Sequence, residues 1–232
     1  MINGVMKQRW PRERDRNRNK SDFFDIINYM EEKEITLSLP LQISEMKKFL
    51  IFASVSILSF FAPFAFGHPQ WLVGTVVNAC LFLGAVYLPK KYYIPLAVLP
   101  SLGVLARGLV FGPFTYFLVY FLPFIWLGNL ILILVFRSVY KFQLKRDPTS
   151  SNLKNAFSQL LEVGSLIGLP ALAKFLFLFL IANIYFKFSI VPSLFVQTMG
   201  LNQLATALAG GLVAFLLFNF YGKYFTGSKQ AS

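Results

Sequence analysis

Cysteine, histidine and acidic residues are all scarce in this chain, and their scarcity excludes several kinds of chemistry. One cysteine, Cys80, and one histidine, His68, occur among the 232 residues. Neither a disulfide framework nor a cluster of Cys and His metal ligands can be built from them. Asp and Glu number 10, and after Lys48 the only acids are Asp147 and Glu162. Most of the chain therefore lacks the paired carboxylates of acid–base or two-metal catalysis.

The motifs of catalysis and nucleotide binding are missing as well. The sequence contains no HExxH zinc motif and no GxxxxGK[ST] phosphate loop. A serine nucleophile would have to share the single histidine, and no supported triad can be assembled around it. We therefore expect no enzyme, no metal, no cofactor and no ATP hydrolysis by the chain alone. An enzyme acting on lipid is disfavoured for the same reasons.

Long apolar runs are what the sequence has in abundance. Hydrophobic residues make up 56% and charged residues 14%, with a mean hydropathy of +0.59, whereas about a quarter of a soluble domain is charged. About 20 apolar residues cross a bilayer core. The sequence therefore predicts an all-α, polytopic membrane protein with six transmembrane helices, at about residues 49–66, 71–88, 92–111, 115–136, 160–186 and 201–221.

The charges between the apolar runs predict which way the chain faces. Basic residues gather in alternate gaps, at 47–48, 90–91, 137–146 and 223–229, while the other gaps hold almost no charge. Loops rich in Lys and Arg stay on the cytoplasmic side. We expect a multi-pass protein of the cell membrane with both termini in the cytoplasm.

Three regions follow from this pattern: a basic cytoplasmic tail with an interfacial helix at 1–45, a six-helix membrane domain at 46–222 and a short cytoplasmic tail at 223–232. The net charge of +12 is concentrated in tails and loops beside the membrane, which favours anionic lipid head groups as its partner. Nucleic acid is not an expected partner, because no foldable segment carries a basic patch with interleaved aromatic residues.

Pro and Gly are concentrated in the third and fifth predicted spans. Interrupted membrane helices are tolerated where neighbouring protein or a cavity takes up the freed backbone groups, so these spans are candidates to lie beside a solute cavity. Ordinary kinking is the alternative. The small residues of the last span, TALAGG at 206–211, predict close approach to another helix.

Two cations lie within the predicted spans, Arg107 in the third and Lys174 in the fifth, and no acid shares the outer half of the bundle with them. Such residues are costly in a membrane and often functional, and an anionic solute would balance them. The alternatives are that Arg107 reaches the head groups and that Lys174 is a neutral or snorkelling lysine bonded to a neighbouring helix. Aromatic and amide side chains of the outer half and of the middle of the membrane complete the set. The candidate solute-binding residues are Arg107, Tyr116, Trp126, Asn129, Lys174 and Asn183.

The chain resembles the substrate-binding S components of energy-coupling-factor vitamin transporters. The likeness rests on six spans with both termini inside, on a first span rich in small residues, on TALAGG at 206–211, and on ARGLVFGPFTYFLVYFLPFIWLGN at 106–129. It covers about residues 46–222, and it departs from the family in the basic tail and in lacking an Ala-xxx-Ala pair in the first span. The resemblance implies uptake of a micronutrient, with a membrane coupling subunit and ATPase subunits as partners. A membrane scaffold or assembly protein acting through its cytoplasmic tail is the alternative function.

Overall fold

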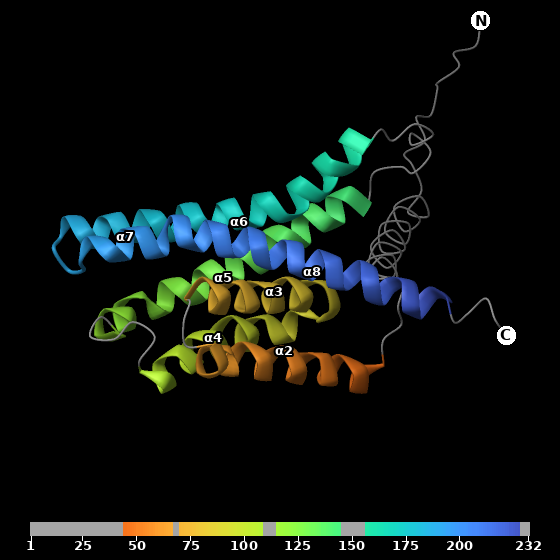
Figure 1. Cartoon of the computed structure of the whole chain (residues 1–232), viewed down its shortest axis with the longest axis horizontal. Helices are drawn as coiled ribbons and strands as arrows, with labels where there is room; N and C mark the ends of the chain where they lie inside the picture. The colour runs from red at the N-terminus through yellow and green to blue at the C-terminus, as the bar shows by residue number, and fades with distance from the viewer. Residues whose placement is uncertain (1–43, 67–69, 109–114, 145–155, 228–232) are drawn as a thin grey trace, which may run out of the picture. The chain divides into compact units, whose positions relative to one another are not determined.

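The structure, a computed structural model, describes residues 44–66, 70–108, 115–144 and 156–227, and this part of the chain is helical with no strands (Figure 1). This confirms the all-α prediction. The basic tail predicted at 1–45 lies almost wholly outside the described residues, as does the end of the chain after Gly227. The helices are α2 (Glu45–Phe66), α3 (Gln70–Tyr87), η1 (Lys90–Tyr92), α4 (Tyr93–Arg107), α5 (Thr115–Leu144), α6 (Ala156–Lys187), α7 (Ser193–Met199) and α8 (Leu201–Gly227).

Five segments of the described chain are long and apolar enough to cross a membrane: α2, α3, most of α5, most of α6, and α7 with α8. The chain is therefore a multi-pass membrane protein by length and composition. The remaining predicted span, at 92–111, is represented by α4, which has 15 residues. Helix α4 ends at Arg107 because Gly108 adopts a left-handed conformation, with φ of 67°, and its N–H bonds to the Val104 carbonyl. This is a common glycine C-cap.

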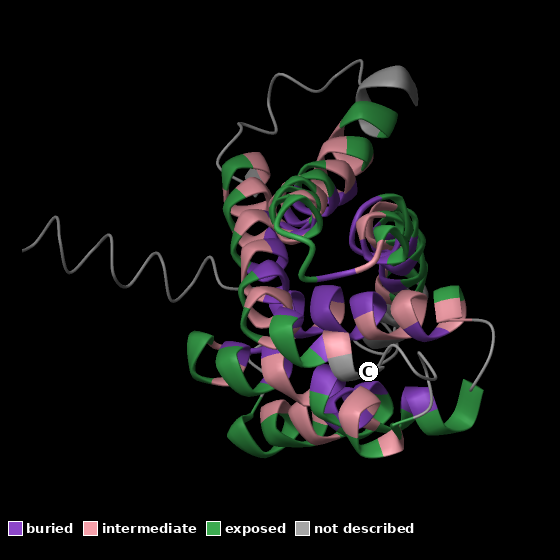
Figure 2. Cartoon of the chain, turned by 90° about the vertical axis from the view of Figure 1, so that its left-hand side faces the viewer, coloured by how far each residue is buried: buried purple, intermediate pink, exposed green. Residues whose placement is uncertain are grey.

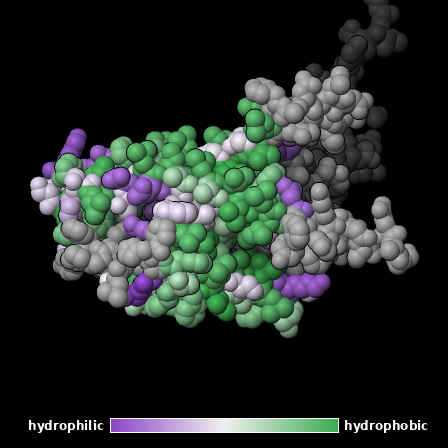
Figure 3. Space-filling model, in the orientation of Figure 1, coloured by the Kyte–Doolittle hydropathy of each residue, from purple (hydrophilic) through white to green (hydrophobic). Residues whose placement is uncertain are grey.

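The outer surface of the described helices is apolar, as expected for contact with lipid. Large hydrophobic side chains stay exposed on several helices, with exposed fractions of 59% for Ile57, 59% for Leu180 and 58% for Leu216. Figure 3 shows hydrophobic side chains over the middle of the visible face and hydrophilic ones mainly toward its two ends. In a soluble protein so much exposed apolar surface would signal an interaction site.

Helix α3 is at the centre of the packing. It is the most buried of the candidate spans, and it contacts α2, α5 and α8. Buried residues lie mainly where the helices face one another, and exposed residues lie mainly on the outside (Figure 2). A central position explains why α3 carries the buried polar residue Asn78 in an otherwise apolar segment, because only a protein-facing side can supply its hydrogen-bond partners.

Small residues allow α8 to approach α3 closely, which confirms the packing predicted for the last span. A Cβ on Gly210 would lie 2.7 Å from the Ala79 nitrogen and 2.7 Å from the Asn78 Cβ, so only glycine fits there. Ala207 and Ala214 of the same helix are also buried, whereas Ala205 and Ala209 are exposed.

Of the helix breaks expected in the third and fifth spans, the one at Gly108 is present, because it ends α4, whereas the internal prolines do not interrupt their helices. Helix α4 continues through Pro100 and α6 continues through Pro170. The first part of α6 nevertheless runs at an angle to the rest of the helix (Figure 1), which is the usual effect of an internal proline. Between the fifth and sixth predicted spans, Ser193–Met199 forms the short helix α7.

Candidate functional site

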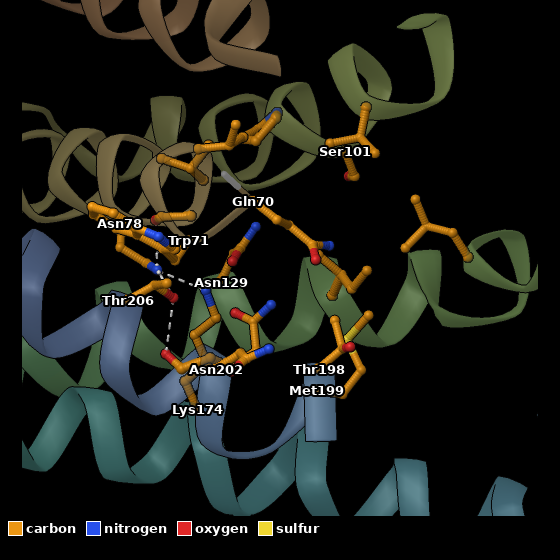
Figure 4. Close-up of a pocket in the computed structure, with 18 residues that line it drawn as sticks. Gln70, Trp71, Asn78, Ser101, Asn129, Lys174, Thr198, Met199, Asn202 and Thr206 are labelled. Atoms are coloured by element: carbon orange, nitrogen blue, oxygen red, sulfur yellow. Dashed lines mark hydrogen bonds between the residues drawn. The ribbon is translucent and has the colours of Figure 1, made fainter. Parts of the chain in front are cut away.

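A cavity of about 340 Å³, here called the polar cavity, lies among the helices in one half of the bundle (Figure 4). Its walls come from the beginnings of α3 and α8, the later part of α4, the earlier part of α5, the end of α7 and the middle of α6. Polar side chains from all six of these helices line it, including Asn78, Ser101, Asn129, Lys174, Thr198, Asn202 and Thr206. The volume is within the range of small-molecule sites.

Lys174 is the charged group of this cavity, and α6 holds it almost completely out of solvent. Its exposed fraction is 2%, and its Nζ donates a hydrogen bond of 2.7 Å to Asn78 Oδ1. The described residues include two carboxylates, Glu45 and Glu162, and neither forms an ion pair with Lys174. Glu162 lies 12 residues earlier on the same helix, which is about 18 Å at the rise of an α-helix. The lysine thus has a neutral amide where a buried ammonium normally has a carboxylate.

Asn78 joins three helices through its side-chain amide. Its Nδ2 donates to the Gly74 carbonyl at 2.9 Å and to Thr206 Oγ1 at 3.2 Å, so α3, α6 and α8 share one chain of hydrogen bonds. Both amide protons are then used, and the Oδ1 is directed to Lys174. An ammonium has three donors, whereas the described residues accept one hydrogen bond from Lys174.

Asn129 contributes an acceptor to the same cavity. Its exposed fraction is 2%, and its Nδ2 donates to the Ala97 carbonyl at 2.9 Å, which ties α5 to α4. No described residue donates to its Oδ1. The polar cavity therefore offers a strong donor at Lys174 and a carbonyl acceptor at Asn129, which is a pattern that a small polar molecule could complete.

Trp126 is one helical turn from Asn129, and it contacts the polar cavity only indirectly, through Ser101. Its Nε1 donates a 2.6 Å hydrogen bond to Ser101 Oγ, and Ser101 donates in turn to the Val98 carbonyl. Ser101 lines the polar cavity and Trp126 does not. Trp126 thereby fixes the orientation of a cavity hydroxyl.

The structure does not bring the other predicted residues to the cavity. Arg107 lies half-buried in the last turn of α4, and its Nη1 is buried without a hydrogen-bond partner in the described structure. Asn183 donates to the Phe179 carbonyl of its own helix, and neither residue lines the cavity. The side chain of Tyr116 lies outside the described part of the chain. Of the six predicted residues, Asn129 and Lys174 line the cavity and Trp126 supports it.

Three residues central to the polar cavity were not among the predicted site residues: Asn78, Ser101 and Thr206. Asn78 is an amide within a predicted span, where polar groups are costly and often functional. That signal made Asn78 a candidate, but it applied equally to Asn183. The hydroxyls of Ser101 and Thr206 gave no comparable signal, because Ser and Thr are common wherever membrane helices pack together.

A second cavity, here called the aromatic cavity, lies among the same helices toward the other end of the bundle. Its volume is about 220 Å³, and its walls come from α3, α5, α6 and α8. The lining is mostly apolar and includes Phe82, Phe136, Phe215 and Phe218. At one edge Gln143 Nε2 donates to the Glu162 carbonyl and to Ser165 Oγ, which joins α5 to α6 there.

The chain was compared with known families, curated proteins and solved structures. No family model, no curated protein and no solved structure matches the chain. The resemblance to S components stays a prediction, and the functional argument rests on the geometry of the polar cavity.

Proposed function

We propose that this chain is a solute-binding membrane protein that captures a small molecule in the polar cavity. The observation that carries the proposal is Lys174, a cation with an exposed fraction of 2%, at the wall of a 340 Å³ cavity and bonded to a neutral amide. Removing an ammonium from water costs several kcal/mol unless an opposite charge compensates it. A protein that keeps such a group at a cavity wall gains most if the compensating charge arrives with a ligand.

The ligand that this geometry favours is small and anionic. A carboxylate or similar group would pair with the Lys174 ammonium, and an N–H or O–H elsewhere in the molecule would donate to Asn129 Oδ1. A volume of about 340 Å³ is at the small end of known ligand pockets, which favours a metabolite-sized solute. Apolar residues such as Val104, Leu118 and Ile125 complete the walls.

The proposal includes six membrane crossings with both termini in the cytoplasm. Successive long helices, α4 among them, run in alternating directions through the bundle (Figure 1), so α2 begins at the end where α8 finishes. In this orientation the polar cavity lies in the outer half, because the beginnings of α3 and α8 line it. Micronutrient uptake driven by a separate coupling subunit and ATPase subunits is the form of transport that suits a chain without a phosphate-binding loop.

Cysteine accessibility tests this orientation. In a Cys80→Ala background, Gln70→Cys and Val191→Cys should react with an impermeant reagent applied outside whole cells, and Lys91→Cys should react only after permeabilisation. Labelling of Lys91→Cys from outside would refute the topology, because this end of α3 carries one of the basic clusters.

Mass spectrometry of the purified chain tests the binding function. Small molecules retained by the wild type would be compared with those retained by Asn129→Leu, which removes a cavity acceptor. The matched control is Asn183→Leu, an asparagine outside the cavity. We expect a solute in the wild type and the control and its loss from Asn129→Leu. Equal content in all three proteins would contradict the proposal and favour a scaffold role.

A further inference from the structure

The polar and aromatic cavities follow one another along the same four helices. On α6, Lys174 lines the first cavity and Ile167 lines the second, two helical turns away on the same face. On α5 the corresponding residues are Asn129 and Phe136, also seven positions apart. On α3, Asn78 is one turn from Phe82 on the same face. The two cavities therefore lie in series, one toward each end of the bundle.

Buried apolar residues, here called the dry layer, lie along α5, α6 and α8 between the residues that line the two cavities. The layer consists of Leu132 and Ile133 on α5, Ala171 on α6 and Ala207 on α8, each with an exposed fraction of 0%. On α6, Ile167 and Lys174 of the two cavity walls are seven positions apart, which is about 10 Å at the helical rise. The layer has no polar side chain among these four residues. Apolar constrictions of this kind block water and solutes until they widen.

The aromatic side of this layer is closed by three residues from three helices. A Cβ on Gly211 would meet the side chain of Ile167 and would lie 3.0 Å from Phe82 Cε2, so α8 presses its backbone against both. The Phe82 ring also packs edge-on against Phe136, with centroids 5.3 Å apart. Ile167 therefore provides the α6 side of this contact.

Pro170 provides a place for this part of α6 to bend. It lies between Ile167 and Lys174 and has no N–H, so the hydrogen bond that the Leu166 carbonyl would accept in a regular helix is missing. Below this point Gly164 and Gly168 have no atoms within 4 Å of where a Cβ would be. The segment before Pro170 contacts α8 through Ile167 at Gly211, and Gln143 of α5 bonds to its Glu162 carbonyl and Ser165 hydroxyl. A bend at Pro170 would have to shift these contacts.

We propose that the solute crosses the membrane through this chain itself, from the polar cavity to the aromatic cavity, when α6 bends at Pro170. The bend would draw Ile167 away from Phe82 and Gly211 and open the dry layer around Ala171 and Ala207. The proposal rests on the proposed function for its solute, and it adds a path and a gate. It places the transport step inside the bundle, as in carriers whose site near the midplane opens to each side in turn.

Accessibility of buried cysteines to a cationic, membrane-impermeant methanethiosulfonate reagent tests the path in proteoliposomes. In a Cys80→Ala background, Ala171→Cys and Ala207→Cys report on the dry layer. Ala182→Cys is the matched control, because it lies on α6, has the same exposed fraction of 0%, and packs in an apolar cluster outside the path. Opening of the layer should make both reporters react about tenfold faster than the control.

Two further variants separate the path from the binding site. Adding Pro170→Ala to Ala171→Cys restores the missing backbone donor, and it should slow labelling to the rate of the control. Thr206→Cys reports on the polar cavity alone. Rapid labelling of Thr206→Cys with control-like rates at both layer positions would overturn the path and leave the cavity intact. Control-like labelling of Thr206→Cys as well would count against the proposed function. A rate at Ala171→Cys that Pro170→Ala does not change would refute the hinge.

Discussion

Lys174→Met separates a ligand-binding lysine from a structural one. Methionine keeps the length and apolar stem of the side chain and removes the charge. The substitution should relieve the cost of burying an ammonium, which is several kcal/mol. It should also leave Asn78 Oδ1 without a donor, which costs about 1–3 kcal/mol. Met is close to Lys in volume, so repacking should add less than about 1.5 kcal/mol.

These contributions predict that the unliganded Lys174→Met protein melts at the wild-type temperature or above it, while solute retention is lost. Thermal unfolding of the detergent-purified chain, with mass spectrometry of bound small molecules, measures both effects. A fall in melting temperature of about 10 °C with solute retained would refute the reasoning, because this is the loss expected when a buried pair that stabilises the fold is broken.

A double-mutant cycle measures how strongly Asn78 and Lys174 depend on each other for the stability of the protein. Asn78→Leu alone leaves the buried ammonium with no acceptor among the described residues, so it should be strongly destabilising. Lys174→Met in addition to Asn78→Leu removes both members of the hydrogen bond and should recover much of that loss, since paired polar groups can be replaced by apolar ones at little cost. Additive effects would show that the two residues do not act together.

Three further outcomes follow from the packing. Gly210→Ala should lower the melting temperature, since a Cβ there meets the backbone of α3. Gly164→Ala should raise it slightly, because its site is open and alanine favours helix. Equal effects of the two substitutions in thermal unfolding would contradict the close approach of α8 to α3. Trp126→Phe should cost about 1–3 kcal/mol by removing the bond to Ser101, and Ser101→Ala in the same background should cost little more in the same assay. Asn183→Ala should leave solute retention unchanged, because its amide bonds to its own helix.

Much of the fold followed from hydropathy because a membrane restricts the choices so strongly. A bilayer core demands internally bonded backbone, so long apolar runs must become helices. Both ends of α3 and the beginning of α8 were predicted within one residue, whereas α8 continues six residues beyond its predicted end at 221. The end of α4 was missed because two properties of glycine conflict. Gly is common in membrane helices, yet Gly108 adopts the left-handed conformation that ends one. Local sequence does not decide between these outcomes.

The site was predicted less completely, since it depends on which helix faces which. Lys174 and Asn129 stood out because polar groups in a span need a reason. Whether Asn183 or Asn78 would join them could not be read from residue type, as both are amides within apolar segments. Asn78 lies on the central helix and faces Lys174 and Thr206, whereas Asn183 bonds to its own backbone. The rotation of each helix about its own axis decides which amide faces the cavity, and residue type does not reveal that rotation.

The short length of α4 has a consequence for the surrounding lipid. Fifteen residues give a helix of about 22 Å, while the hydrocarbon core is about 30 Å thick. In the proposed topology of six crossings, this mismatch would thin the bilayer beside α4 or draw head groups and water inward. Arg107 at its last turn favours the same deformation, and Pro100 and Ser101, two turns below, line the polar cavity. The defect in the membrane at α4 would thus shorten the distance that a charged solute must travel from bulk water to Lys174.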